Sequence, residues 1–171
     1  MSKQVYISAD YDKYGDRYVV DELVKWGEDD KHKVDFIDMS NPSSGSVANS
    51  DDCRICDLKA EFNSQINASS AVIFVVGDMT KYRTAGSGCE RNNTDWWNVS
   101  NINSYSYLRH EFEQAKKKDK TIIILYNSTR YETSWLPSYM DGYEDNAHPF
   151  WKYVNGKKVG DYEYIKEALG F

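Results

Sequence analysis

The stretch Ala71-Val72-Ile73-Phe74-Val75-Val76 decides the fold of this chain. It is an unbroken apolar run that starts after Ser69-Ser70 and stops at Gly77. Runs of this kind are typical of a strand that is buried on both faces, as in the centre of a parallel sheet. The stretch Thr121–Tyr126 (TIIILY) repeats the pattern. The sequence therefore predicts two fully buried strands.

The segments before the central run alternate between strand and helix patterns. Val5-Tyr6-Ile7-Ser8 is rich in β-branched and aromatic residues, and Lys33–Met39 alternates like a second strand. Between them, apolar residues recur at helical spacing from Arg17 to about Glu28. A second helix, which Asp51 or Asp52 can cap, precedes the central strand, and its apolar face comprises Ile55, Leu58, Phe62 and Ile66.

The segments after the central run begin with a long polar insertion, residues 80–104, which shows little periodicity. Such loops inside a domain are usually functional or disordered. A helix follows from Tyr107 to the lysines at 116–118, residues 127–146 are irregular, and 161–169 predicts a closing helix. This order predicts one α/β domain over residues 1–171, with a mostly parallel sheet and helices on both faces.

Composition narrows the classes of function. The chain has 171 residues, which suits one domain, and a formal net charge of −6, which argues against binding along a nucleic-acid backbone. The N-terminus lacks a signal-peptide pattern and no stretch is long and apolar enough to span a membrane, so we expect a cytoplasmic protein without a membrane partner. Cys53 and Cys56 are expected one turn apart on a helix rather than in a metal or redox site.

Candidate sites follow from the predicted sheet. In such folds ligands bind beyond the carboxyl ends of the strands, at the point where the strand order reverses. The nucleotide-binding glycine motifs and the Gly-x-Ser-x-Gly elbow are absent, and His32, His110 and His148 lie in separate segments, so no metal site is predicted. Glu111 is expected in the first turn of the 107–118 helix, facing the crevice. An acid there can also simply stabilise the helix N-terminus.

Two stretches resemble the TIR-like proteins of the bacterial Thoeris anti-phage system. They are LKAEFNSQINASSAVIFVVGD from Leu58 to Asp78 and YLRHE from Tyr107 to Glu111, and the opening Val5–Ser8 with Asp16-Arg17 fits as well. The resemblance covers most of residues 3–128. It implies a flavodoxin-like TIR fold and cleavage of NAD+ at the nicotinamide–ribose bond. The product would be an ADP-ribose derivative, often cyclic, that activates a partner effector.

The resemblance also implies roles for individual residues. Glu111 would be the catalytic glutamate, with Glu90, in the 80–104 insertion, as its rival. We expect substrate-binding residues in the loops at the carboxyl edge: Ser8, Ala9, Asp10, Tyr11, Asp38, Asp78 and Tyr107. NAD+ would be the substrate and no cofactor is expected. A phage-derived activator and a homo-oligomer are further expected partners.

Two other readings remain open. The chain can be a non-catalytic module, TIR-like or receiver-like, that binds a protein partner through the same loops; Asp78 and Asp10 fit a receiver site only loosely. It can also be an enzyme similar to nucleoside deoxyribosyltransferases, which share the fold type and a catalytic glutamate.

Overall fold

A computed structural model describes residues 3–9, 16–29, 34–37, 54–82 and 106–171 of the chain, with backbone alone for 34–37 and 54–60. Of the predicted site residues, Asp10, Tyr11, Asp38 and Glu90 lie outside the described residues, as do Cys53 and the capping residues Asp51 and Asp52. Within the described residues, no helix has the length and apolar character needed to cross a membrane.

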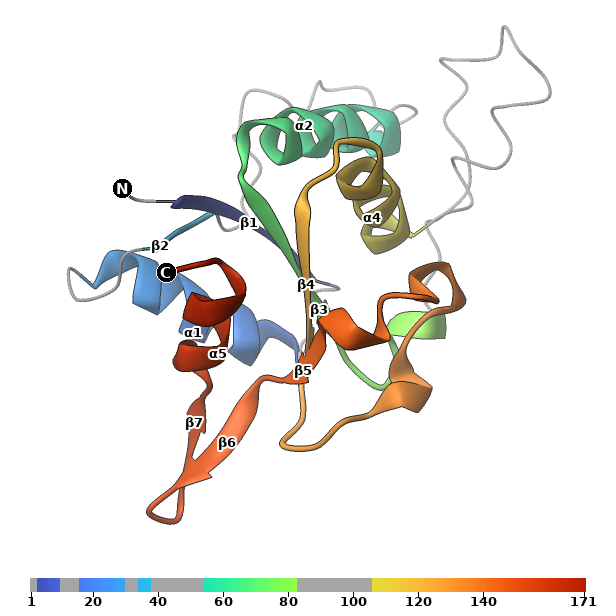
Figure 1. The fold of residues 1–171 in the computed structure, drawn as a ribbon. Helices are drawn as coiled ribbons and strands as arrows, with labels where there is room; N and C mark the ends of the chain where they lie inside the picture. Colours follow the sequence, from blue (N-terminus) through green and yellow to red (C-terminus); the bar gives the residue numbers. More distant parts are fainter. Residues whose placement is uncertain (1–2, 10–15, 30–33, 38–53, 83–105) are drawn as a thin grey trace, which may run out of the picture.

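The centre of the molecule is a five-stranded sheet in the order β2-β1-β3-β4-β5 (Figure 1). Its strands are β1 (Lys3–Ala9), β2 (Val34–Ile37), β3 (Ala71–Val76), β4 (Thr121–Tyr126) and β5 (Ala147–Pro149). Every neighbouring pair is parallel. This is the flavodoxin-like order, in which the direction of strand addition reverses between β1 and β3. The predicted flavodoxin-like α/β fold is confirmed.

In the part of the chain that the structure describes, helices cover both faces of the sheet. Helices α1 (Asp16–Glu28) and α5 (Tyr162–Ala168) lie on one face, and α2 (Arg54–Ala68) and α4 (Tyr107–Lys117) lie on the other (Figure 1). Since side chains alternate along a strand, Val5 and Ile7 of β1 join the α1/α5 core, while Tyr6 joins the α2/α4 core. The prediction of helices on both faces is confirmed.

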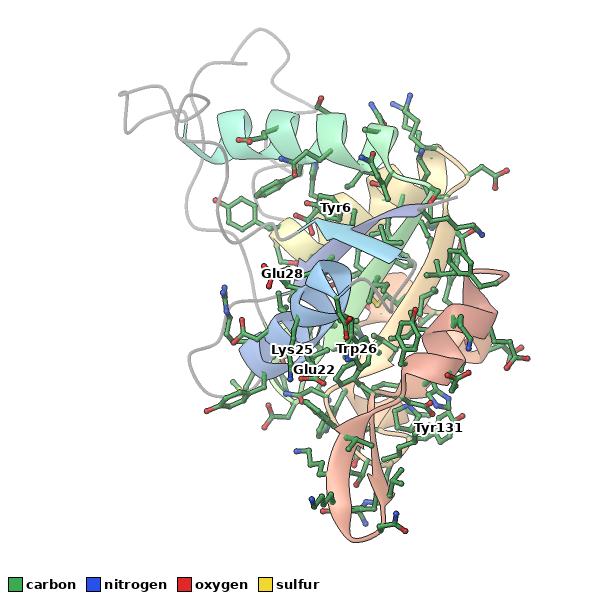
Figure 2. All side chains as sticks on the ribbon, turned by 90° about the vertical axis from the view of Figure 1, so that its left-hand side faces the viewer. Tyr6, Glu22, Lys25, Trp26, Glu28 and Tyr131 are labelled. Carbon is green, nitrogen blue, oxygen red and sulfur yellow. The ribbon has the colours of Figure 1, made fainter. Side chains whose placement is uncertain are left out.

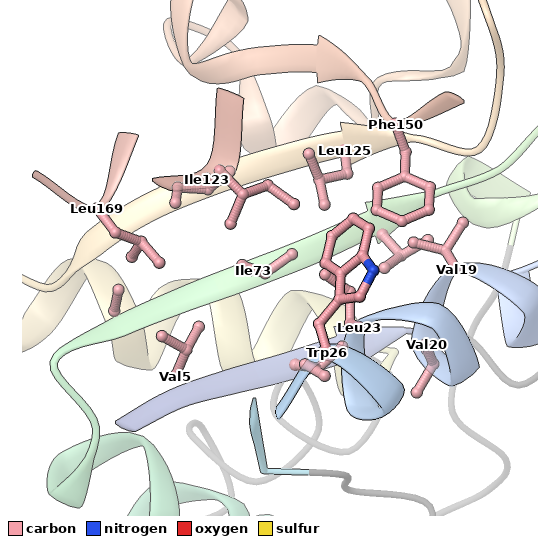
Figure 3. Close-up of a cluster of buried hydrophobic side chains, with 14 residues drawn as sticks. Val5, Val19, Val20, Leu23, Trp26, Ile73, Ile123, Leu125, Phe150 and Leu169 are labelled. Atoms are coloured by element: carbon pink, nitrogen blue, oxygen red, sulfur yellow. The ribbon is translucent and has the colours of Figure 1, made fainter. Parts of the chain in front are cut away.

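The α1/α5 core is built around Trp26 (Figure 3). Its indole ring packs on Phe150 with ring centroids 5.6 Å apart, and edge-on against Tyr162 of α5 at 5.1 Å. Gly160 closes this cluster, because a Cβ there would lie 2.7 Å from the indole ring and 2.8 Å from the ring of Phe150. The backbone therefore approaches the core closely only because this residue is glycine.

Most predicted elements are confirmed, and the differences fall near the C-terminus. Residues 127–146 contain only short 3-10 turns, as the predicted irregular segment implied. The sequence did not predict β5, nor the antiparallel hairpin of β6 (Trp151–Val154) and β7 (Lys157–Gly160). Strand β5 has three residues, too few to produce a recognisable alternation.

Candidate functional site

Glu111 lies at the start of α4 and points onto β1. The helix begins at Tyr107, after Ser106, whose side chain accepts a hydrogen bond from the backbone N–H of Arg109 at 3.1 Å. This capping geometry fixes where the helix starts. Glu111 is the fifth helical residue, so the expectation that it lies in the first turn is wrong: it stands in the second turn, where the favourable effect of a helix terminus on an acid is weaker.

The carboxylate of Glu111 is held by two hydroxyl groups of β1. Tyr6 donates to Oε1 at 2.8 Å, and Ser8 donates to Oε2. Tyr6 and Ser8 are two residues apart on the strand, so both side chains leave the same face of the sheet. Glu111 is 4% exposed and Ser8 is 1% exposed. Each oxygen of this buried carboxylate therefore accepts a hydrogen bond from β1.

This site lies where the topology predicts a ligand site. Ser8 pairs with Phe74 near the carboxyl ends of β1 and β3, the two strands between which the order reverses. Figure 2 labels Tyr6 between the sheet and the α2/α4 layer. The predicted facing of Glu111 toward this region is therefore supported, although its carboxylate is buried against β1 rather than open.

Other predicted residues surround the same edge. Ala9, at the end of β1, is half-buried and packs against the α1/α5 core. Asp78 is exposed in the turn after β3, where the N–H of Gly77 donates to Oγ1 of Thr80 at 2.8 Å. Tyr107 is half-buried and meets the ring of Phe62 edge-on, with centroids 5.7 Å apart.

A second polar corner at the carboxyl edge was not predicted from the sequence. Asp16, the first residue of α1, is 6% exposed and accepts a hydrogen bond of 3.1 Å from Nδ2 of Asn127, the residue after β4. Trp151 in turn donates to Oδ1 of Asn127 at 2.8 Å. A Cβ at Gly77 would lie 2.5 Å from Oδ1 of Asp16, so any other residue at this position would displace the Asp16 carboxylate. The position of Asn127 directly after a buried strand was the available signal.

Tyr6 was also missed as a site residue. Its sequence context, within a strand and beside apolar residues, predicts an ordinary core aromatic. Its spacing of two residues from Ser8 was the signal that both hydroxyls share one face. Among the described residues, no group of three or more histidine, cysteine, aspartate or glutamate side chains is arranged to hold a metal ion.

No family model matches the chain, and no curated protein sequence matches it. Among solved structures, the chain is similar to a prokaryotic SEFIR domain with a TM-score of 0.45 and 16% sequence identity, over 97% of this chain and 92% of that one. The assignment of the fold rests on the strand order of the chain itself, which is that of a flavodoxin-like α/β protein.

Proposed function

We propose that this protein is a TIR-like enzyme that cleaves NAD+ at the nicotinamide–ribose bond, with Glu111 as the catalytic group. One observation carries the proposal: the carboxylate of Glu111 is fixed by Tyr6 and Ser8 beside the β1/β3 switch point. Ligands of flavodoxin-like folds bind at this point. The sequence resemblance supplies the reaction, and the arrangement of the site is compatible with it.

The chemistry suits a single carboxylate. Nicotinamide leaves a cationic glycoside as a neutral molecule, so the leaving group needs no proton donor. The ribose passes through an oxocarbenium-like state, which a fixed negative charge stabilises. Tyr6 and Ser8 would orient the carboxylate of Glu111, and a ribose hydroxyl would take the place of the Ser8 hydroxyl on Oε2. Pre-orientation of this kind reduces the reorganisation needed in the transition state.

NAD+ must reach the carboxylate of Glu111 for this reaction to occur. A side chain that is 4% exposed does not meet a substrate without rearrangement. We therefore include an activation step in the proposal, in which an activator or assembly with further copies of the chain opens the region over Ser8 and Glu111. A phage-derived trigger, a cyclic ADP-ribose product and an effector that the product activates complete the proposed role in anti-phage defence.

The proposal is tested by incubating purified protein with NAD+, with and without lysate from phage-infected cells that lack the gene. We expect nicotinamide release by the wild type in the presence of the activator, and none by Glu111→Ala or Glu111→Gln. Tyr18→Phe, which changes an exposed tyrosine of α1, is the matched control and should retain activity. Intact NAD+ with the wild type, under conditions that activate cells, would contradict the proposal.

A non-catalytic interaction module is the second candidate, and one observation favours it. Both oxygens of Glu111 already accept hydrogen bonds from β1, as in a carboxylate whose role is to join a helix to a sheet. This reading expects cellular function to survive Glu111→Gln, which keeps the size and one acceptor of the side chain. It also expects function to fail when residues 80–104 are trimmed.

A further inference from the structure

A separate group of polar side chains, here called the array, lies beside β5, the strand at one lateral edge of the sheet. It contains Tyr131, which follows β4, His148 of β5 and Asp161, the residue that caps α5. Two strands, β3 and β4, separate β5 from β1, so this array is about 14 Å or more from Ser8 by the usual strand spacing. Figure 2 shows Tyr131 beside α5, far from Tyr6.

In the array each side chain donates a hydrogen bond to the next, from Tyr131 to His148 and from His148 to Asp161. Nε2 of His148 lies 3.2 Å from Oδ2 of Asp161, and Nδ1 of His148 lies 3.2 Å from the hydroxyl of Tyr131. An ionised carboxylate only accepts hydrogen bonds, so Nε2 must carry the hydrogen. In the neutral ring Nδ1 is then an acceptor, and Tyr131 donates to it. The orientation is that of an alcohol, a base and an orienting acid.

The surroundings keep the acid ionised and the ring in place. Burial by itself raises the pKa of Asp161, but hydrogen bonds from Lys152 and His148 and from the N–H of Tyr164 outweigh it, so the pKa lies below its ordinary value. Lys152 donates to Oδ1 at 2.7 Å. The ring of Tyr164 stacks on His148 with centroids 3.7 Å apart at 11°, which fixes the plane of the imidazole.

Tyr131 itself is open to solvent. It is 62% exposed, whereas the side chains of His148 and Asp161 are 23% and 17% exposed. An exposed hydroxyl adds little to folding stability through one hydrogen bond, since water offers the same partner. His148 and Asp161 are thus less exposed and are held by hydrogen bonds and ring stacking, while Tyr131 is open to solvent, which is the arrangement expected of a nucleophile and its base.

We propose that Tyr131 is a nucleophilic tyrosine that takes an acyl group from an activated ester, with His148 as its general base and Asp161 as the group that orients His148. In this step a bond forms between Oη of Tyr131 and the carbonyl carbon, and the bond from that carbon to the alcohol oxygen breaks. The phenolic proton moves to Nδ1 of His148 and then to the departing alkoxide or aryl oxide. Asp161 stabilises the imidazolium formed in between.

The test is acetylation of the intact chain by p-nitrophenyl acetate at neutral pH, followed by peptide mass spectrometry. The chain supplies an internal control, because Tyr153 on β6 is 66% exposed and belongs to no such array among the described residues. We expect Tyr131 to be acetylated at least about 100-fold faster than Tyr153, which is the lower range of general-base catalysis. Equal rates at the two tyrosines would overturn the proposal.

Two variants separate catalysis from folding. Asp161→Asn keeps a good helix cap, since asparagine caps as well as aspartate, but cannot stabilise the imidazolium. We expect it to slow acetylation of Tyr131 while leaving the rate at Tyr153 unchanged. Tyr131→Phe should abolish the fast release of p-nitrophenolate. Fast release that persists in Tyr131→Phe would assign the nucleophile to another group and overturn the proposal.

Discussion

The hydroxyl of Tyr6 donates a 2.8 Å hydrogen bond to Oε1 of Glu111, a residue 105 positions later in the chain. This bond joins β1 to α4 across one core of the protein, where the ring of Tyr6 is completely buried. The same bond orients the proposed catalytic carboxylate. Folding and the proposed chemistry therefore depend on one pair of side chains, and both can be measured separately.

Removal of the Tyr6 hydroxyl should lower stability. In Tyr6→Phe the carboxylate of Glu111 loses a buried donor, which costs about 1–3 kcal/mol of unfolding free energy. Urea unfolding followed by circular dichroism measures this difference. Tyr18→Phe, at a tyrosine that is 65% exposed, is the control and should unfold like the wild type. Equal midpoints for Tyr6→Phe and the wild type would mean that the bond contributes nothing.

Truncation of Glu111 should destabilise the fold more than an isosteric change. Glu111→Ala leaves the hydroxyls of both Tyr6 and Ser8 without this acceptor and opens a cavity, and we expect a loss of about 2–5 kcal/mol. Glu111→Gln keeps the volume and one acceptor oxygen, so its loss should be smaller. The comparison also shows which variant is folded well enough for activity assays. If the alanine variant were as stable as the glutamine variant, the hydrogen bonds of Glu111 to Tyr6 and Ser8 would not stabilise the fold.

Gly160 should not tolerate a side chain. A methyl group there meets the rings of Trp26 and Phe150 at 2.7–2.8 Å, and overpacking of this kind costs about 1–3 kcal/mol. Thermal unfolding of Gly160→Ala measures the cost. In a Trp26→Phe background, where the larger ring is gone, the same substitution should cost less. Equal costs in the two backgrounds would show that the contact is not the cause.

Asp161 should make stability depend on pH at the acid end. Its pKa is lower in the folded chain than the ordinary value of 3.8, because the hydrogen bonds from Lys152 and His148 and from the N–H of Tyr164 outweigh its burial. Its contribution is thus fully present above the unfolded-state value and is lost as the pH falls through the folded-state value. The stability advantage of the wild type over Asp161→Asn should shrink below pH 3.8. If the stability difference between the wild type and Asp161→Asn stayed constant below pH 3.8, the pKa of Asp161 would not be lowered in the folded chain.

Long, regular segments were predictable from the sequence. The apolar runs of β3 and β4 and the helical spacing of Val19, Val20 and Leu23 depend on local pattern alone, and all are confirmed. Strand β5 and the β6–β7 hairpin were not predicted, because short strands contain too few residues to show an alternation of apolar and polar side chains. Their positions depend on contacts with β4 and Trp26, which are distant in sequence.

The candidate site was predictable only in part. The topology rule predicted Glu111 and Ser8 at the same edge of the sheet, since it concerns where strands end, and the two side chains are hydrogen-bonded to each other. It could not predict that Glu111 is buried, because burial depends on the side chains of Tyr6 and Ser8 that face it. The array of Tyr131, His148 and Asp161 joins three segments that share no motif, so only the folded chain brings these residues together.

Mass spectrometry of nucleotides from phage-infected cells that carry either the wild type or Glu111→Gln tests most directly whether Glu111 cleaves NAD+. We expect NAD+ to fall, and nicotinamide and an ADP-ribose derivative to accumulate, with the wild type alone. Catalysis by Glu111 would be contradicted if cells were protected while NAD+ stayed intact, or if Glu111→Gln cells, with the protein folded and equally abundant, produced the same nucleotides.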